Sequence, residues 1–281
     1  MEMPGTITSG FSEAEKFAAA LRAEGVLSVL VTGTGEFRAR LTQVALHQLR
    51  LSAAEEHLSR IALVAVPADM ILVSLARGGT SAPIWGGVRL DANEIITLAA
   101  RQRLHMRTDG PCRWGSIWMP AGELAGYGRA LTGADFTLPS AARWRLRPAM
   151  IRRLRHLHSA GIRVAEGSPN VLIGAEAAHG LEQQLIEALV ECLANGSEID
   201  TSRLTIEHQD VALRFEALLQ TKLEHALRMA DICKMLGISA RDFRLACQEQ
   251  LGVDPVTYAR RRLMHRGIAE TRWHMKGSCK Q

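Results

Sequence analysis

The sequence has few of the features that mark secreted, membrane or metal-binding proteins. It contains five cysteines, an odd number without a C-x-x-C pair, so neither a disulfide framework nor a zinc site of that type is expected. Its longest apolar runs, 61–67 and 70–73, are far shorter than the ~20 residues that cross a bilayer. The first residues, MEMPGTITSGFSEAEKF, have neither a basic start nor an apolar core, so no signal peptide is expected. We therefore expect a cytoplasmic protein with reduced, mostly buried thiols and no membrane segment.

Most of the chain also lacks an excess of charge of either sign. Residues 1–200 hold 20 basic and 20 acidic side chains, whereas residues 201–281 hold 14 basic and 9 acidic ones, so the net charge of +5 arises in the second part. Lysine and arginine release counterions from phosphates, and a basic end is typical of nucleic-acid-binding proteins. An ordinary solvated basic surface has the same composition. The charge distribution favours nucleic-acid binding without deciding it.

The motifs of metal-dependent and nucleophilic enzymes are missing. A metal-dependent β-barrel enzyme needs a His-x-His pair and a nearby carboxylate on its strands. His156 and His158 lie two residues apart in a predicted helix and point to different faces. The stretch Gly33–Phe37 lacks the third glycine and the following helix of a dinucleotide-binding loop, and no G-x-S-x-G elbow occurs. We expect no enzyme activity, no cofactor and no metal. The histidines of the N-terminal half are isolated from one another, namely His47, His57 and His105.

Residues 25–120 form short apolar runs separated by Gly, Pro, Asp and Asn, the pattern of strands joined by turns. In one run Phe37, Ala39 and Leu41 alternate with polar residues, which predicts a strand with one solvent-facing side. Many short strands at close spacing favour a β-barrel or a β-sandwich. Corners are expected at Gly86-Gly87. The predicted strands are 28–32, 37–46, 61–66, 70–76, 95–98 and 113–119.

After Pro120 the apolar period becomes 3.6, which indicates helices. Two apolar stripes run along residues 150–162 and 181–193, and Asn195-Gly196 supplies a stop signal for the second. The polar stretch GSEIDTS that follows is the expected linker. The helix over residues 175–193 has two interpretations, a homodimer face or part of the intrachain core, and the second is the more common use of such a stripe.

Shorter helices are expected beyond the linker. Apolar residues at helical spacing mark one at 211–219 and another at 229–236. A third begins after Ser239, a predicted N-cap, and Asp242 is expected to reach back to the amide of the cap in a capping box. A fourth begins at residues 254–255, where Asp and Pro supply the cap and the first helical position.

The second and third of these helices predict a helix-turn-helix joined by the turn 237–239. In this motif the second helix enters the major groove of DNA. Arginine pairs with guanine and glutamine with adenine, so a polar stripe along the third helix is predicted to contact base edges. The predicted base contacts are Arg241, Arg244, Leu245 and Gln248, and the predicted phosphate contacts are Ser239, Ala240, Arg260, Arg261, Arg262 and Arg266.

The run MADICKMLGISARDFRLACQEQLGVDPVTYARRRLMH resembles the first helix-turn-helix and the start of the connecting helix of AraC/XylS-family transcription regulators. The most specific part is Gly-Val-Asp-Pro-Val-Thr-Tyr followed by arginines. The resemblance covers residues 205–270 and implies a cytoplasmic regulator that binds promoter DNA. The strand-rich half, including RWGSIWMP, is similar to the cupin-like sensor domains that precede the DNA-binding end in this family.

Two features depart from the family pattern. Many members have arginine at the position of Leu245, so we expect base contact to have moved to Arg244. Members also have a second helix-turn-helix after the connecting helix, whereas the stretch GIAETRWHMKGSCKQ has no apolar period and no turn. We therefore expect a truncated end with one reading helix, and weakened sequence-specific binding unless the chain dimerises.

A sensor domain of this kind would hold a small effector between its strands. Trp114 and Trp118 share one face of a predicted strand, and together with Trp85 and His105 they are the predicted ligand-binding residues. The alternative for the tryptophans is ordinary core or rim packing, and for His105 it is an isolated surface or cavity histidine.

The sequence thus predicts an α+β protein. A cupin-like β-barrel or sandwich over residues 1–135 is followed by a helical linker or dimerisation segment, 136–200, and an all-α helix-turn-helix domain, 201–281. The predicted function is an effector-responsive, sequence-specific transcription regulator. The alternative is a paralogue that binds a ligand or a protein partner and not DNA. The predicted partners are double-stranded promoter DNA, a small-molecule effector, a second copy through residues 175–193, and RNA polymerase.

Overall fold

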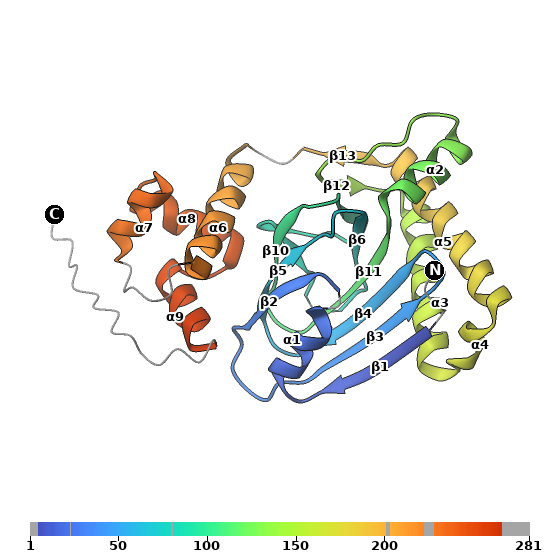
Figure 1. Cartoon of the computed structure of the whole chain (residues 1–281), viewed down its shortest axis with the longest axis horizontal. Coiled ribbons are helices and arrows are strands. Elements are labelled where there is room, and N and C mark those ends of the chain that lie inside the picture. The colour runs from blue at the N-terminus through green and yellow to red at the C-terminus, as the bar shows by residue number, and fades with distance from the viewer. Residues whose placement is uncertain (1–4, 23, 80, 201–202, 222–227, 266–281) are drawn as a thin grey trace. The chain divides into compact units, whose positions relative to one another are not determined.

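The computed structural model describes residues 5–22, 24–79, 81–200, 203–221 and 228–265. The chain divides into two compact units, residues 1–85 with 89–201 and residues 86–88 with 202–281. The first combines antiparallel sheets with helices and the second is built mainly of helices, which confirms the predicted α+β class (Figure 1). Within the described ranges, no helix is both long and apolar enough to cross a membrane.

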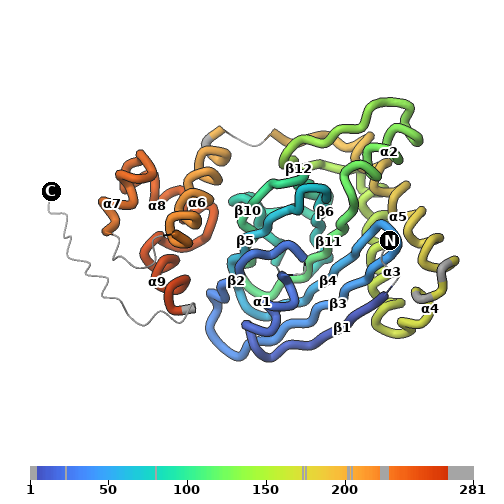
Figure 2. Tube along the Cα trace, viewed as in Figure 1, coloured from blue at the N-terminus to red at the C-terminus, as the bar shows by residue number. Residues whose placement is uncertain are grey.

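The larger sheet of the first unit has eight strands in the order β1-β3-β4-β11-β6-β9-β12-β13. Neighbouring strands run antiparallel, and Figure 2 shows β1, β3 and β4 side by side. Strands were predicted at β3, β6, β9 and β11, and all four are present. The eight strands span Gly5–Phe11 (β1), Ala39–Ala45 (β3), Arg50–Glu56 (β4), Met70–Ala76 (β6), Glu94–Leu98 (β9), Cys112–Pro120 (β11), Ala141–Arg145 (β12) and Ser197–Ile199 (β13).

The smaller sheet has the order β2-β5-β10-β7-β8. The short β7 and β8 are joined by Gly86-Gly87, whose φ angles of 53° and 81° lie in the left-handed region that glycine adopts without strain. The predicted corner is therefore a tight turn. The strands span Val26–Val31 (β2), Arg60–Ala65 (β5), Ile84–Trp85 (β7), Val88–Arg89 (β8) and Arg103–Thr108 (β10).

Both faces of the larger sheet are buried, as alternate residues of β11 show. Trp114 and Trp118 belong to a core shared with the smaller sheet, whereas Ile117 and Met119 belong to a second core shared with helices. A strand that is covered on both sides needs apolar residues at every position. Accordingly, every residue of Met70–Ala76 is buried, and all but Ser74 are apolar.

Helices cover the outer face of the larger sheet (Figure 1). On α5 the apolar side chains Leu185, Leu189 and Leu193 are buried in the same core as the sheet residues. The intrachain interpretation of the 175–193 stripe is therefore correct, and the stripe is not available as a dimer face. The helices of this unit span Ala14–Arg22 (α1), Ala121–Thr132 (α2), Pro148–Gly167 (α3), Asn170–Ile173 (α4) and Ala175–Asn195 (α5).

Two local predictions need correction, and the predicted helix end at Gly196 is confirmed. The expected linker GSEIDTS contains β13, which pairs with β12. Gly196 ends α5 with a φ of −75°, so its role is close packing: an added Cβ would lie 2.6 Å from the carbonyl oxygen of Cys192. Thr42, expected on the solvent side of its strand, is buried and donates to Glu166 of α3 at 2.8 Å. For β13 and for Thr42, a contact between segments distant in sequence decides the outcome.

Gly115 of β11 lies directly against the imidazole of His158 on α3. A Cβ at this position would lie 2.6 Å from Cε1 of His158, and that ring is fully buried. We expect Gly115→Ala to lower the free energy of unfolding by about 1–3 kcal/mol, because a packed core cannot absorb the added atom. The matched control is Gly110→Ala, where nothing lies within 4 Å of the added Cβ, and it should change stability by less than ~0.5 kcal/mol. Urea denaturation of both variants measures the difference, and equal stability of the two would contradict this packing.

Candidate nucleic-acid interface

The second unit is built from α6 (Arg203–Thr221), α7 (Met229–Leu236), α8 (Ala240–Leu251) and α9 (Pro255–His265). Its core centres on three aromatic rings. Phe215 of α6 meets Phe243 of α8 edge to face at 4.8 Å between ring centroids, and Tyr258 of α9 lies 6.0 Å from Phe215. Aromatic residues from three helices therefore fix how α8 and α9 pack on α6.

The turn between α7 and α8 follows the predicted residues. Gly237 has a φ of 70°, and its amide donates to the carbonyl of Lys234 while the Ile238 amide donates to that of Cys233. This is a Schellman ending, which requires a left-handed residue at the glycine position. Arg214 of α6 also donates to the carbonyl of Leu236 at 2.9 Å. The sharp turn is thus specified locally by glycine and held from outside by α6.

Ser239 caps α8, as predicted, but the partner of Asp242 differs. The Asp242 amide donates to Oγ of Ser239 at 3.1 Å, and the Ser239 hydroxyl donates to the Asp242 carboxylate at 2.7 Å. The carboxylate was expected to accept from the Ser239 amide. Both groups are exposed, so the cap also sets a negative charge in the first turn of α8, where the helix dipole stabilises it.

The two faces of α8 differ sharply in chemistry. Phe243, Ala246 and Cys247 are buried, which confirms the predicted core face. The four residues predicted to contact bases are all exposed and recur at i, i+3, i+4 and i+7, so they share the opposite face. Among them Leu245 is 51% exposed, which is unusual for a large aliphatic side chain. The exposed residues of this face are Arg241, Arg244, Leu245 and Gln248.

Asp254 caps α9, as predicted. Its Oδ1 accepts from the amides of Val256 at 3.1 Å and Thr257 at 3.0 Å. Burial by itself would raise the pKa of the Asp254 carboxyl, but the hydrogen bonds from Thr257 and Val256 outweigh it and lower the pKa. The cap is therefore ionised at neutral pH and fixes the start of α9 beside the end of α8.

Arg262 does not belong to a phosphate-contacting surface. It is 6% exposed and its guanidinium donates to Oε1 of Glu216 on α6. The phenol of Tyr258 donates to the other carboxylate oxygen at 2.6 Å. Burial raises the pKa of Tyr258, and the nearby Glu216 raises it further, so the phenol remains a donor. The prediction for Arg262 is wrong because its side chain ties α9 to α6.

The other predicted phosphate contacts have different outcomes. Ser239, Ala240 and Arg260 are exposed, and Arg261 is half-buried. Arg266 lies outside the described residues, and so does the stretch GIAETRWHMKGSCKQ, for which no second helix-turn-helix is expected. The basic surface that remains available consists of α8 residues and Arg260.

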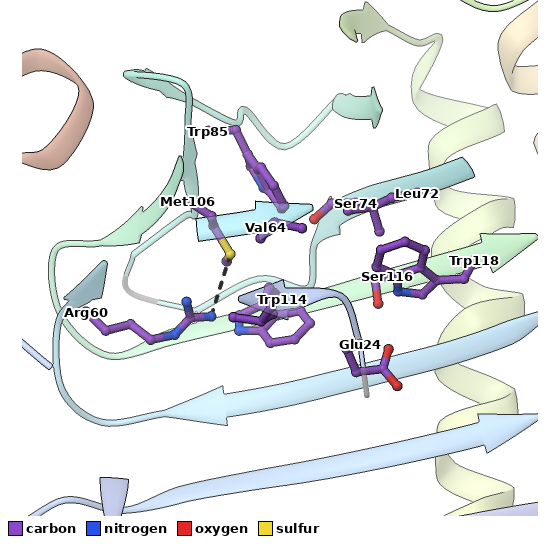
Figure 3. A pocket seen from close by; sticks show the side chains of 11 residues that line it. Glu24, Arg60, Val64, Leu72, Ser74, Trp85, Met106, Trp114, Ser116 and Trp118 are labelled. Atoms are coloured by element: carbon purple, nitrogen blue, oxygen red, sulfur yellow. Dashed lines mark hydrogen bonds between the residues drawn. The ribbon is translucent and has the colours of Figure 1, made fainter. Parts of the chain in front are cut away.

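A second candidate site lies in the first unit, between the two sheets. Trp85, Trp114 and Trp118 line one cavity of ≈ 20 Å³, so the structure brings the three predicted tryptophans together (Figure 3). Several polar atoms of its lining are buried without a hydrogen-bond partner in the described structure. They are Nη1 of Arg60, Nε1 of Trp85, Nε1 of Trp118 and Oγ of Ser116.

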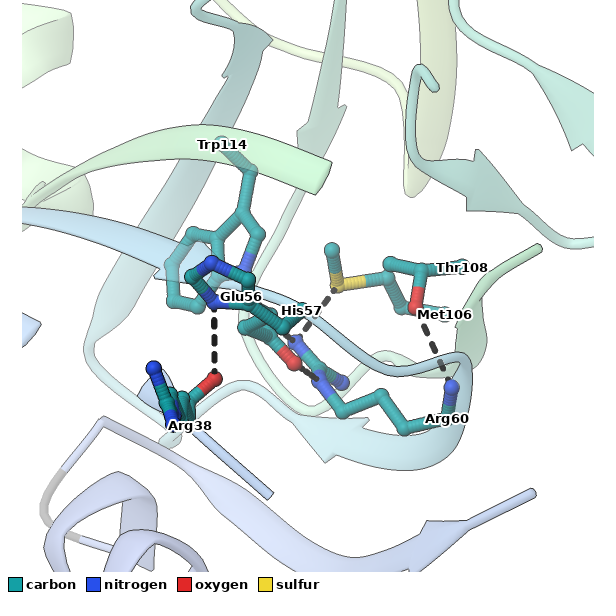
Figure 4. Close-up of polar contacts among 7 residues, drawn as sticks. All are labelled: Arg38, Glu56, His57, Arg60, Met106, Thr108 and Trp114. Atoms are coloured by element: carbon teal, nitrogen blue, oxygen red, sulfur yellow. Dashed lines mark hydrogen bonds and ion pairs between the residues drawn. The ribbon is translucent and has the colours of Figure 1, made fainter. Parts of the chain in front are cut away.

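Arg60 is the residue of this cavity that the sequence did not reveal. Two of its nitrogens donate to Glu56, and Nε1 of Trp114 donates to the same carboxylate (Figure 4). The guanidinium also lies 5.7 Å from the centre of the Trp114 ring. The Glu56 carboxylate therefore neutralises the charge of Arg60 inside the core, while Nη1 of Arg60 can still donate a hydrogen bond to a ligand. An arginine that opens a run of apolar residues, as in Arg60–Ala65, is the signal that could have marked it.

His105 does not join this cavity. It precedes Met106 on β10, and Met106 lines the cavity, so the side chain of His105 points to the opposite face of the strand. The structure therefore does not place His105 among the residues that line this cavity, and with 2% of its surface exposed it is not a surface histidine. In the described residues, no three His, Cys, Asp or Glu side chains are grouped as they would be around a metal ion.

No family model matches this sequence, and no curated protein matches it. Among solved structures, the chain is similar to the AraC-like transcriptional activator CuxR, with a TM-score of 0.49, 19% identity and coverage of 94% of this chain and 96% of that chain. It is also similar to ToxT from Vibrio cholerae with bound unsaturated fatty acid, with a TM-score of 0.30, 13% identity and coverage of 79% and 96%. Similarity of this size does not establish the family of this chain or what it binds.

The assignment of Arg262 and Arg260 to different roles can be tested on one helix. We expect Arg262→Gln to lower the free energy of unfolding by about 3–5 kcal/mol, because it leaves the Glu216 carboxylate buried without its ion pair. Arg260→Gln on the exposed side of α9 should leave stability within ~0.5 kcal/mol. Thermal unfolding followed by circular dichroism measures both. If Arg262→Gln were as stable as Arg260→Gln, the buried ion pair would not hold α9.

Proposed function

We propose that this chain is a sequence-specific DNA-binding transcription regulator whose reading helix is α8. The observation that carries the proposal is the exposed face of Arg241, Arg244, Leu245 and Gln248, set on a helix whose other face is packed in the core. Twelve residues of α helix span about 18 Å, enough to lie along a major groove ~12 Å wide. The glycine turn after α7 and the Ser239 cap give the two-helix motif that presents such a helix.

The composition of the exposed face supports base reading over simple phosphate binding. Arg241 and Arg244 have the donor geometry that pairs with guanine, and Gln248 can pair with adenine. Within the described part of the chain, the Gln248 side chain makes one long hydrogen bond, 3.4 Å to the carbonyl of Gly252, so its amide can turn to a base. Leu245 adds an apolar contact of the kind that thymine methyl groups accept. The resemblance of the following segment to AraC/XylS regulators points to the same class.

The DNA proposal predicts a preferred site that survives competitor DNA. For a site selected from a random duplex library, we expect Arg244→Ala to cost about 1–3 kcal/mol of binding free energy and to relax the preference at one base pair. Arg260→Gln should instead weaken binding to every duplex and reduce the salt slope by about 1. Fluorescence anisotropy over a range of salt concentrations measures both effects.

The matched control for these variants is Arg203→Gln. Arg203 is exposed on α6 of the same unit and already paired with Glu207, so its loss removes the same charge away from the reading face. Its affinity should stay within about twofold of the parent, which is below ~0.4 kcal/mol. Binding that is equal for all sequences, or that Arg203→Gln weakens as much as Arg244→Ala, would rule out base reading by α8. A complete lack of binding would leave the ligand- or partner-binding paralogue as the function.

A second function is favoured by the cavity between the sheets, which we propose as the site of a small effector. Buried donors without partners cost free energy, so the N–H groups of Trp85 and Trp118 and Nη1 of Arg60 favour a guest that accepts hydrogen bonds. The volume of ≈ 20 Å³ has room for a group about the size of a water molecule. The surrounding tryptophans must shift for anything larger to enter.

Two tryptophan variants test whether the donors are unsatisfied. Trp114 donates to Glu56, and we expect Trp114→Phe to cost about 1–3 kcal/mol of stability because the carboxylate loses a partner. Trp118→Phe removes an N–H that has no partner, so it should cost clearly less than Trp114→Phe. Urea denaturation of both proteins without added ligand compares them. Equal losses would show that the Trp118 N–H is already satisfied and would remove the reason for a guest.

A further inference from the structure

A run of arginines leads into α3 and continues along it. Residues 143–163 contain seven arginines and no Asp or Glu, although the first 200 residues as a whole are balanced in charge. Arg143 and Arg145 share one carboxylate, that of Glu94, which compensates one of their two charges. The arginines without carboxylate partners that concern us lie further along the chain, on α3.

The polar residues of α3 form one stripe on its surface. Arg152, Arg155, Ser159 and Arg163 recur at i, i+3, i+7 and i+11, which places them on one side of the helix over about 16 Å. With His156 and Arg153 they border an open hollow of ≈ 590 Å³. We name Arg152, Arg155, His156, Ser159 and Arg163 the α3 basic stripe.

The arginines of the α3 basic stripe lack counter-charges. Among the described residues, no carboxylate lies within ion-pair distance of Arg152, Arg155 or Arg163. Arg155 is half-buried, its Nε has no hydrogen-bond partner, and burial lowers the pKa of its guanidinium. Glu166, the acidic residue of the same helix, accepts from Thr42 and pairs with Arg40 at 3.6 Å. Burying part of an unpaired cation is unfavourable, and an anion bound at the stripe would offset that cost.

Arg153 differs from its neighbours in one respect. It lies in the same turn of α3, but it pairs with Glu187 at 3.6 Å and with Glu191 at 2.8 Å on α5. Its charge is therefore compensated within the protein. The helix thus provides one arginine with carboxylate partners and three without, on otherwise similar backbone.

We propose that the α3 basic stripe binds a compact anion that carries at least two phosphate groups. Three guanidinium groups spread over about 16 Å match several phosphates better than a single one, and guanidinium forks pair with phosphate through two hydrogen bonds. The Ser159 hydroxyl lies between them as a further donor. The three guanidinium groups lie on one side of one helix, a short span that suits a compact ligand rather than a long duplex. This proposal does not depend on DNA reading by α8.

The test uses the full chain and three probes: tripolyphosphate, a nucleoside triphosphate, and the same nucleoside without phosphate. Isothermal titration calorimetry should detect saturable binding of the first two and none of the third. Tighter binding of the nucleotide would identify a nucleotide ligand, and equal binding would identify a site that reads phosphates alone. Both results support the proposal.

The variant that tests the stripe is Arg152→Gln/Arg155→Gln/Arg163→Gln. It should bind tripolyphosphate at least tenfold more weakly, whereas Arg129→Gln should change affinity less than twofold, because Arg129 lies on α2, outside the hollow, and pairs with Asp135 at 2.9 Å. Stability without ligand is a second readout, because Arg155→Met should leave the melting temperature unchanged or raise it if the cation is uncompensated. No saturable binding at millimolar probe, an equal effect of Arg129→Gln, or a destabilised Arg155→Met would overturn the proposal. The proposal would also be overturned if the triple variant lost binding to duplex DNA but kept binding to tripolyphosphate. That result would identify the stripe as a nucleic-acid surface.

Discussion

Glu216 lies buried on α6 with its two carboxylate oxygens accepting from α9, one from the phenol of Tyr258 and one from the guanidinium of Arg262. A buried carboxylate is tolerated only when such partners satisfy it, so this contact fixes how α9 packs on α6. Tyr258 also packs on Phe215, whose ring meets Phe243 of α8. The position of α8 in its unit therefore depends on the buried carboxylate of Glu216.

The first unit follows a different constraint, because its larger sheet is covered on both faces. Alternate residues of β11 serve two cores, one between the sheets and one under α3 and α5. Polar groups within these layers must find partners, as Arg60 does with Glu56. In the described residues, Nε1 of Trp118 and Nε of Arg155 have no such partner. A ligand that accepts a hydrogen bond from either group would stabilise the folded protein. The two ligand proposals arise from that shared logic, one in the core and one on the surface.

Arginine illustrates how one residue type takes separate roles in this chain. Arg262 was grouped with Arg260 because both follow the same basic run, yet one is a buried tie and the other is exposed. Helical spacing accounts for the difference only once the side of α9 that faces α6 is known. The α3 basic stripe went unnoticed for a related reason, since the even balance of charge over 200 residues conceals arginines whose partners are absent locally.

The sequence by itself determined the local elements and the face of α8 that stays exposed. Gly237, Ser239, Asp254 and Pro255 set helix ends through backbone preference and capping, which act within a few residues of chain. Only the tertiary structure decided the burial of Arg262, the pairing of β13 in the expected linker, and the use of the α5 stripe as core. Each of these depends on which distant segment lies opposite, and no local preference encodes that partner.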